Sequence, residues 1–131
     1  MYDIVIVGGG PAGLTAGLYA GRAKLKTLLI EQLVAGGQAA TTDLIENYPG
    51  AAEGSTGPDI TERMEEQAKK FGCEFVMAEV TGVDFGGKEK IVKTTDGEFK
   101  AKAVIITSGA THRKMGCPGE VEFTGRGVSY C

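Results

Sequence analysis

Three glycines near the start of the chain constrain its fold more than any other feature. Gly8, Gly10 and Gly13 stand in the spacing G-x-G-x-x-G, within the stretch GGGPAG. The run YDIVIV before them is typical of a buried parallel strand, and the small residues after them have helical character. KTLLIE at 26–31 predicts a second strand, so strand, helix and strand follow one another within about thirty residues. This order predicts a βαβ unit with a right-handed crossover.

The same glycine turn has the properties of a phosphate-binding site. Its first glycine allows a tight turn, its second lets a pyrophosphate approach the backbone, and its third lets the helix pack on the strand. The start of the helix offers free N–H groups and the positive end of its dipole. Glu31 ends the second predicted strand, where a carboxylate can accept hydrogen bonds from an adenosine ribose. The pattern predicts a dinucleotide and leaves open whether it is FAD or a nicotinamide; for a nicotinamide, Glu31 favours NAD over NADP.

A second helix is well signalled in the middle of the chain. Residues 32–56 before it are expected to form a long loop, which is usually functional when it occurs in a compact domain. Pro58 suits a first helical turn and Gly72 a carboxyl-terminal stop. The apolar stripe of this helix is expected to consist of Ile60, Met64, Ala68 and Phe71. In the first helix, glycines recur every four residues from Gly13 to Gly21, which predicts close packing of that face against a sheet.

The rest of the chain predicts strands followed by an irregular tail. CEFVMAEVTGVDF at 73–85 provides strand residues, and the pair Asp96-Gly97 predicts a hairpin. AVIIT at 103–107 predicts another buried strand, and the tail after it has turn-forming composition. The fold class is therefore α/β and Rossmann-like, a parallel sheet with a βαβ unit and a small antiparallel hairpin layer.

Composition excludes several classes of function. The 131 residues carry a net charge of −3 and no Lys/Arg run longer than a pair, which argues against nucleic-acid or membrane-surface binding. No stretch approaches the roughly 20 apolar residues of a membrane helix, and no targeting segment is recognised. The three cysteines are widely spaced, which favours a reducing cytoplasm over a disulfide framework. Cys73 and Cys117 are expected to be packed as small hydrophobic residues, and the single histidine, His112, is assigned no role.

Longer motifs extend over essentially the whole chain. DIVIVGGGPAGLTAGLYAGRA is followed by GGQ, TT and IENYPG, and then by GAT, RKMGCPGE and GRGVSYC. In this order and spacing, the motifs resemble the amino-terminal part of low-molecular-weight thioredoxin reductases. The resemblance implies a discontinuous FAD-binding domain with an NADPH domain inserted in its middle. Residues 1–115 are then expected to be the amino-terminal segment of the FAD-binding domain, and 116–131 the start of the connection into the absent NADPH and redox-disulfide domain.

The resemblance also implies FAD as the cofactor, with NADPH in the complete enzyme, and a set of contact residues. The pyrophosphate is expected at Gly8, Gly10, Pro11, Ala12 and Gly13, and the adenosine ribose at Glu31. The flavin half is expected along Gly37, Gln38, Thr41 and Asn47. The adenine is expected at the backbone of Val80, and the last strand is expected to close on the cofactor through Thr107, Ser108, Gly109 and Ala110. No metal is expected.

Cys131 matches the first cysteine of the Cys-x-x-Cys pair of that family, and it is the predicted catalytic residue. The resemblance implies that this cysteine exchanges with the disulfide of thioredoxin or a similar protein, while the second cysteine faces the flavin. In the complete enzyme, electrons pass from NADPH through FAD and the pair to thioredoxin, and a homodimer is expected. With the second cysteine and the NADPH domain missing, the chain alone is expected to be inactive.

Other functions compete with this interpretation. The chain could be a non-catalytic FAD- or ADP-binding module of a split flavoprotein, or part of the flavoprotein reductase of a peroxidase system. Ferredoxin could replace NADPH as the electron donor. Half of an NAD-dependent dehydrogenase is disfavoured, because a nicotinamide site has no evident use for the long loop with GGQ and ENYPG.

Overall fold

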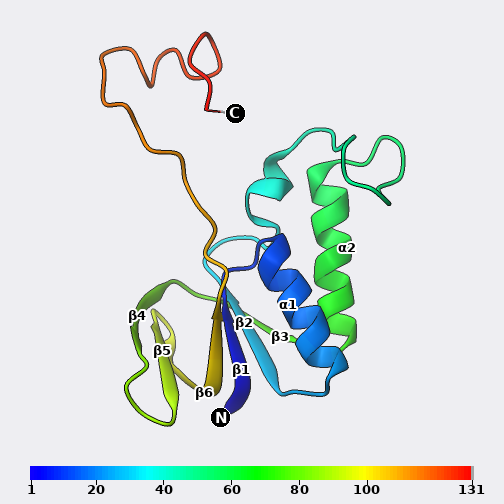
Figure 1. The fold of residues 1–131 in the computed structure, drawn as a ribbon, viewed down its shortest axis with the longest axis vertical. Coiled ribbons are helices and arrows are strands. Elements are labelled where there is room, and N and C mark those ends of the chain that lie inside the picture. Colours follow the sequence, from blue (N-terminus) through cyan, green and yellow to red (C-terminus); the bar gives the residue numbers. More distant parts are fainter. Residues whose placement is uncertain (131) are drawn as a thin grey trace.

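The computed structural model describes residues 1–130, so the predicted catalytic Cys131 lies outside the described residues. Figure 1 shows the order of the elements along the chain. They are β1 (Tyr2–Val7), α1 (Pro11–Arg22), β2 (Thr27–Glu31), the 3-10 helix η1 (Gly37–Thr41), α2 (Gly57–Lys70), β3 (Glu74–Met77), β4 (Val80–Asp84), β5 (Lys90–Thr94) and β6 (Gly97–Ile106). The strands form one six-stranded sheet in the order β3-β2-β1-β6-β5-β4. The predicted α/β fold is confirmed.

The sheet combines a parallel part with an antiparallel part. β1 lies between β2 and β6 and runs parallel to both, and β3 extends the parallel part beyond β2. Val7 at the end of β1 pairs with Ile30 of β2 and with Ile106 of β6. The carboxyl ends of the three central strands therefore meet at one edge, which is where ligands bind in open α/β sheets. The hairpin predicted at Asp96-Gly97 is also confirmed, because it joins the antiparallel strands β5 and β6.

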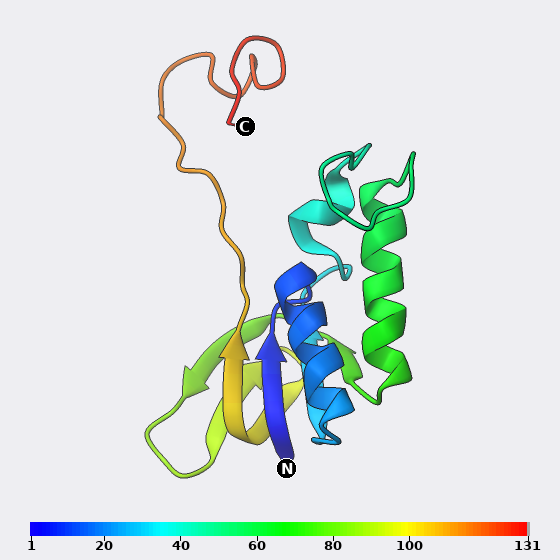
Figure 2. The same cartoon turned by 45° about the vertical axis from the view of Figure 1, so that its right-hand side comes forward.

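Side chains alternate between the two faces of the central strands, and each face is covered differently. Figures 1 and 2 show α1 and α2 side by side next to the sheet. On their face, Ile6 and Leu29 pack with Leu14 of α1 and Ala68 of α2. On the opposite face, Val5, Leu28 and Ile30 pack with Ala78, which lies between β3 and β4, with Val92 of β5 and with Ala101 of β6. β1 and β2 have buried side chains on both faces, as their continuous apolar runs predict. The prediction of a buried strand at 103–107 is wrong in part, because Ala103 is exposed and Ile106 is 61% exposed. An apolar run does not show whether a neighbouring element covers it.

The glycine face of α1 packs differently from the prediction. Only Gly13 lies against the turn after β1. A Cβ on Gly17 would lie 2.9 Å from Sγ of Cys73, and a Cβ on Gly21 would lie 2.6 Å from the carbonyl oxygen of Phe71. Both glycines therefore allow α1 to approach α2 and the segment after it. The prediction that this face packs against the sheet is wrong for Gly17 and Gly21, because helical periodicity alone does not say which neighbour a face meets.

Three further expectations require correction. The long loop 32–56 contains the short helix η1, which begins after Gly36 at a φ of +120°. Phe71 lies just beyond α2 and is 43% exposed, whereas Thr61 is buried and its hydroxyl donates to the carbonyl oxygen of Gly57. Cys73 is buried as predicted, but Cys117 is exposed, because it lies on the tail and not in the core. None of the helices in residues 1–130 is long and apolar enough to cross a membrane.

The segment after β6 leaves the sheet and ends in a compact turn away from the two helices (Figures 1 and 2). Within this turn, the N–H of Phe123 donates to the carbonyl oxygen of Gly119 at 2.9 Å. The N–H of Val128 donates to the carbonyl oxygen of Phe123, also at 2.9 Å. Backbone hydrogen bonds within the tail therefore fold residues 119–128 into a local turn.

Candidate nucleotide-binding site

The turn between β1 and α1 is locked in a form that only glycine permits. Gly8 has a φ of +104°, and a Cβ there would lie 2.4 Å from the carbonyl oxygen of Thr107. A Cβ on Gly13 would lie 1.9 Å from the carbonyl oxygen of Gly8. The hydroxyl of Thr107 donates to the carbonyl oxygens of Val7 and Gly8, at 2.9 and 2.8 Å. Thr107, just after β6, thus holds the glycine turn in place, and no side chain fits between Thr107 and this turn.

The two long helices begin in opposite ways. Thr56 and Asp59 form a capping box at the start of α2, so that helix satisfies its first N–H groups with its own side chains. The start of α1 has no side-chain cap, and its first turn contains no acidic residue. The N–H groups of Ala12 and Gly13 in that turn have no partner within the helix. The start of α1 therefore offers unused donors and a positive dipole end to an anion.

Glu31 is fixed at the end of β2 beside this turn. One carboxylate oxygen accepts the N–H of Gly9 at 2.6 Å, and the other accepts the N–H of Gln32 at 2.8 Å. A Cβ on Gly9 would lie 3.0 Å from Cβ of Glu31, so this glycine lets the carboxylate approach the turn. Gly9 was not among the predicted site residues, although it is the middle glycine of the run GGG, and that run was its signal in the sequence.

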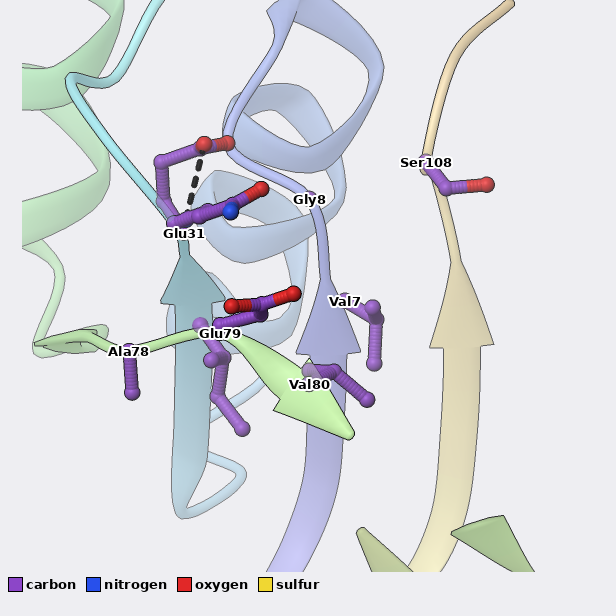
Figure 3. A pocket seen from close by; sticks show the side chains of 9 residues that line it. Val7, Gly8, Glu31, Ala78, Glu79, Val80 and Ser108 are labelled. Atoms are coloured by element: carbon purple, nitrogen blue, oxygen red, sulfur yellow. Dashed lines mark hydrogen bonds between the residues drawn. The ribbon is translucent and has the colours of Figure 1, made fainter. Parts of the chain in front are cut away.

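Two hollows lie along this edge of the sheet. The first, shown in Figure 3, has a volume of about 380 Å³, and it is lined by Val80 at the start of β4 and by Glu79 just before it. The second has a volume of about 450 Å³ and runs from the start of α1 to η1 and the segment after β6. Gly8, Glu31 and Ser108 line both, so the hollows adjoin. Each volume falls within the range of small-molecule sites.

The structure brings most of the predicted contact residues to these hollows. Val80 lines the first hollow, and the second is lined by Gly10, Pro11, Ala12, Gly37, Gln38, Thr107, Gly109 and Ala110 together with the shared residues. The side-chain amide of Gln38 also donates to the carbonyl oxygen of Ala110, which links η1 to the segment after β6. Glu79 lines the first hollow without having been predicted, and its side chain had no signal in the sequence.

Three predicted residues line neither hollow. Gly13 lies beneath the glycine turn, where it allows the close contact described above. The hydroxyl of Thr41 donates to the carbonyl oxygen of Gln38 at 2.8 Å and so holds η1 together. Asn47 is exposed on the loop before α2. The prediction of Thr41 and Asn47 as flavin contacts therefore depends on the resemblance alone.

We call the two adjoining hollows the groove, and together they have the shape and the donors that an extended dinucleotide requires. A Cβ on Gly10 would have only the Cα of Gly37, at 3.8 Å, as a neighbour, so the backbone is open to a ligand there. The start of α1 lines the second hollow, where it can accept a pyrophosphate next to the first hollow. The residues present fit the adenosine diphosphate part of FAD. The described residues contain no group of His, Cys, Asp and Glu that could hold a metal ion.

These features define a class of protein: an α/β domain that binds a dinucleotide at the carboxyl edge of its parallel sheet. The chain belongs to the pyridine nucleotide-disulphide oxidoreductase family, whose sequence profile matches residues 2–131.

Relatives within this family cover the whole chain. It is 54% identical to a thioredoxin reductase of Peptoclostridium litorale and 50% identical to one of Bacillus subtilis, each over 131 residues. A crystal structure of thioredoxin reductase from Lactococcus lactis superposes with a TM-score of 0.87 at 48% identity. The chain corresponds to 42%, 41% and 43% of the lengths of these three proteins, so it spans about two fifths of each. The predicted resemblance is confirmed.

Proposed function

We propose that the chain is the FAD-binding portion of a thioredoxin-disulfide reductase. The single observation that carries the proposal is the groove along one edge of the sheet, where the uncapped start of α1 lies between Glu31 and Gln38. The identity of about half the residues to thioredoxin reductases over the full chain supports the same function. Residues 1–115 would form the amino-terminal segment of the FAD domain, and 116–131 the connection into the NADPH domain.

Each part of the groove has its own role in this proposal. The N–H groups at the start of α1 hold the pyrophosphate, with Gly8 and Gly10 allowing its approach. Glu31 accepts hydrogen bonds from the ribose, and the backbone of Val80 contacts the adenine. The segment after β6 closes the groove through Ser108 and its neighbours. The flavin half then extends past Gly37 and Gln38, while Thr41 and Asn47 are supported by the sequence resemblance alone.

The complete protein would use this portion as one part of an electron path. Bound FAD supplies two-electron transfer between NADPH and a cysteine pair. The residues of this chain bind and orient the cofactor, and Cys131 supplies the thiol that exchanges with thioredoxin or a similar disulfide protein. A cytoplasmic location belongs to the same proposal, because the reaction needs reduced thiols and a soluble disulfide partner. The proposal of a homodimer depends on the resemblance to thioredoxin reductases alone.

Titration of the purified chain with FAD tests the proposal. Flavin fluorescence is expected to fall as FAD binds, and ADP is expected to compete because it occupies the same half of the groove. Glu31→Gln is expected to weaken FAD binding about tenfold, since a charged acceptor is replaced by a neutral one. Glu62→Gln, on the exposed side of α2, is the matched control and should bind FAD like the unchanged chain. Folded chain that fails to bind FAD, or binds it equally well with Gln at 31, would contradict the proposal.

A further inference from the structure

The first hollow of the groove contains a carboxylate beside that of Glu31, and the proposed function leaves it without a role. Glu79 lies just before β4, and it lines this hollow together with Glu31. Figure 3 shows the side chain of Glu79 pointing into the hollow, on the side where Gly8 lies. Within residues 1–130, the lining of this hollow contains no lysine, arginine or histidine. The hollow therefore repels anions and is suited to groups that donate hydrogen bonds.

Glu31 has little hydrogen-bonding capacity left for a ligand. Its Oε2 accepts the N–H of Gly9 at 2.6 Å. Its Oε1 accepts the N–H groups of Gln32 and Leu33, at 2.8 and 3.2 Å. A carboxylate oxygen accepts about two hydrogen bonds, so Oε1 is fully used and Oε2 has room for about one more. Glu31 can therefore accept a hydrogen bond from the ribose, but it cannot serve every donor group of an adenosine.

Glu79 is held by its backbone, whereas its carboxylate is not used by the protein. The N–H of Glu79 donates to the hydroxyl oxygen of Thr95 at 3.3 Å, and the N–H of Thr95 donates to the carbonyl oxygen of Glu79 at 3.0 Å. Thr95 lies in the turn between β5 and β6, so the antiparallel layer fixes the position of Glu79. Within residues 1–130, no hydrogen bond or ion pair engages the carboxylate of Glu79. This carboxylate can therefore accept from a ligand without losing a contact to the protein.

We propose that Glu79 is a specificity residue for adenine, and that its carboxylate accepts a hydrogen bond from the exocyclic amine of the base. Glu79 directly precedes Val80, whose backbone contacts the adenine in the proposed function, so its carboxylate belongs to that end of the hollow. The ribose is assigned to Glu31, and the exocyclic amine is the donor group of an adenosine that remains. The inference rests on the proposed function for the presence of FAD, and it adds the side chain that recognises its base.

Competition against FAD measures this preference in the full chain. Flavin fluorescence is followed while bound FAD is displaced either by ADP or by the diphosphate of purine riboside. The purine riboside compound lacks the exocyclic amine and keeps the ribose, the two phosphates and the other ring atoms of ADP. The ratio of the dissociation constants of the two competitors therefore reports the amine alone, whatever the affinity for FAD. Far-ultraviolet circular dichroism shows whether each variant is folded.

The unchanged chain is expected to bind ADP about tenfold more tightly than the purine riboside diphosphate, because the acceptor of the amine is charged. In Glu79→Ala this ratio should fall by about threefold or more, since the acceptor is removed. Glu79→Gln keeps one acceptor oxygen without the charge and should give an intermediate ratio. Glu62→Ala, on the exposed side of α2, removes the same charge outside the groove. It is the matched control and should keep the ratio of the unchanged chain.

Two results would overturn the inference. If folded Glu79→Ala keeps the ratio of the unchanged chain, the carboxylate does not accept from the amine; this holds whether both affinities stay the same or weaken equally. FAD binding by the unchanged chain would still support the proposed function in that case. If the folded unchanged chain binds neither FAD nor ADP, the proposed function and the role of Glu79 fail together. The two failures are thus distinguished by the unchanged chain alone.

Discussion

Gly17→Ala tests the close packing of α1 against α2 and the residue Cys73 that follows α2. The new Cβ would lie 2.9 Å from Sγ of Cys73, which is well inside the ~3.5–4.0 Å of ordinary contact. Its next neighbours, Cβ of Cys73 and Cβ of Ala68, lie at 3.6 and 3.7 Å and leave enough room. The sulfur atom is therefore the one obstacle to a side chain at this position.

Two opposing effects set the size of the change. Overpacking a core costs about 1–3 kcal/mol, whereas replacing glycine by alanine within a helix contributes about 0.8–1 kcal/mol of stability. Cys73 is buried against Gly17, so the helix cannot escape the contact by exposing it to solvent. The net expectation for Gly17→Ala is a loss of up to about 2 kcal/mol in the free energy of unfolding.

A double-mutant cycle with Cys73→Ala separates these effects. Cys73→Ala alone removes the buried sulfur and should destabilise the chain by about 1 kcal/mol through the space it leaves. In that background, Gly17→Ala fills part of the space and should stabilise the chain by up to about 1 kcal/mol. The two changes are thus expected to couple by about 2 kcal/mol.

Urea unfolding followed by far-ultraviolet circular dichroism measures all four corners of this cycle. Unfolding free energies that add to within about 0.5 kcal/mol would refute the reasoning, because additivity is the behaviour of sites that do not touch.

Three further predictions concern the α2 cap, the thiols and the tail. Thr56→Ala should lower the free energy of unfolding by about 1 kcal/mol in urea titrations, since Thr56 caps α2; an unchanged value would contradict the capping role. Burial raises the pKa of Cys73 to about 11, so iodoacetamide near pH 8 should label Cys117 first and Cys73 only after unfolding, and equal labelling would argue against the packing described. The carboxylate of Glu120 accepts hydrogen bonds from the hydroxyl of Tyr130 and from the N–H groups of Met115 and Gly116, which lower its pKa. These hydrogen bonds should be at full strength above the ordinary value of 4.5 and weaken as the pH falls through the lowered one. On the alkaline side, the hydrogen bond from Tyr130 to Glu120 raises the pKa of Tyr130 to about 12, so tyrosinate absorbance should show Tyr130 ionising near 12 and this bond weakening above the ordinary value of 10.0. Ionisation of Tyr130 near its ordinary value of 10.0 would count against the hydrogen bond.

The central part of the fold could be predicted because its signals are local. β-branched runs predicted the parallel strands, and the pair Asp96-Gly97 predicted the hairpin that joins β5 to β6. The glycine spacing predicted the turn before α1, because only glycine permits the φ of Gly8 and the contact beneath Gly13. Each of these features depends on residues close together in the chain.

The errors concern neighbours that are distant in sequence. Periodicity showed that Gly17 and Gly21 share a face of α1. The neighbour of that face is the region of Phe71 and Cys73, about fifty residues further along the chain. The path of the long loop between them cannot be predicted from its local sequence. The exposed position of Cys117 depends on where the tail leaves the sheet. Gly9 beside Glu31 has significance only once β2 lies next to β1.

The sequence by itself therefore determined the strand, turn and helix that can receive a pyrophosphate, and the family to which the chain belongs. Only the tertiary structure decided that Val80 lines the same hollow as Glu31, that η1 reaches the segment after β6, and that the hydroxyl of Tyr130 donates to Glu120. The physical reason is that backbone conformation follows from neighbouring residues. Contacts between distant segments instead depend on how the buried faces of the whole sheet and its helices fit together.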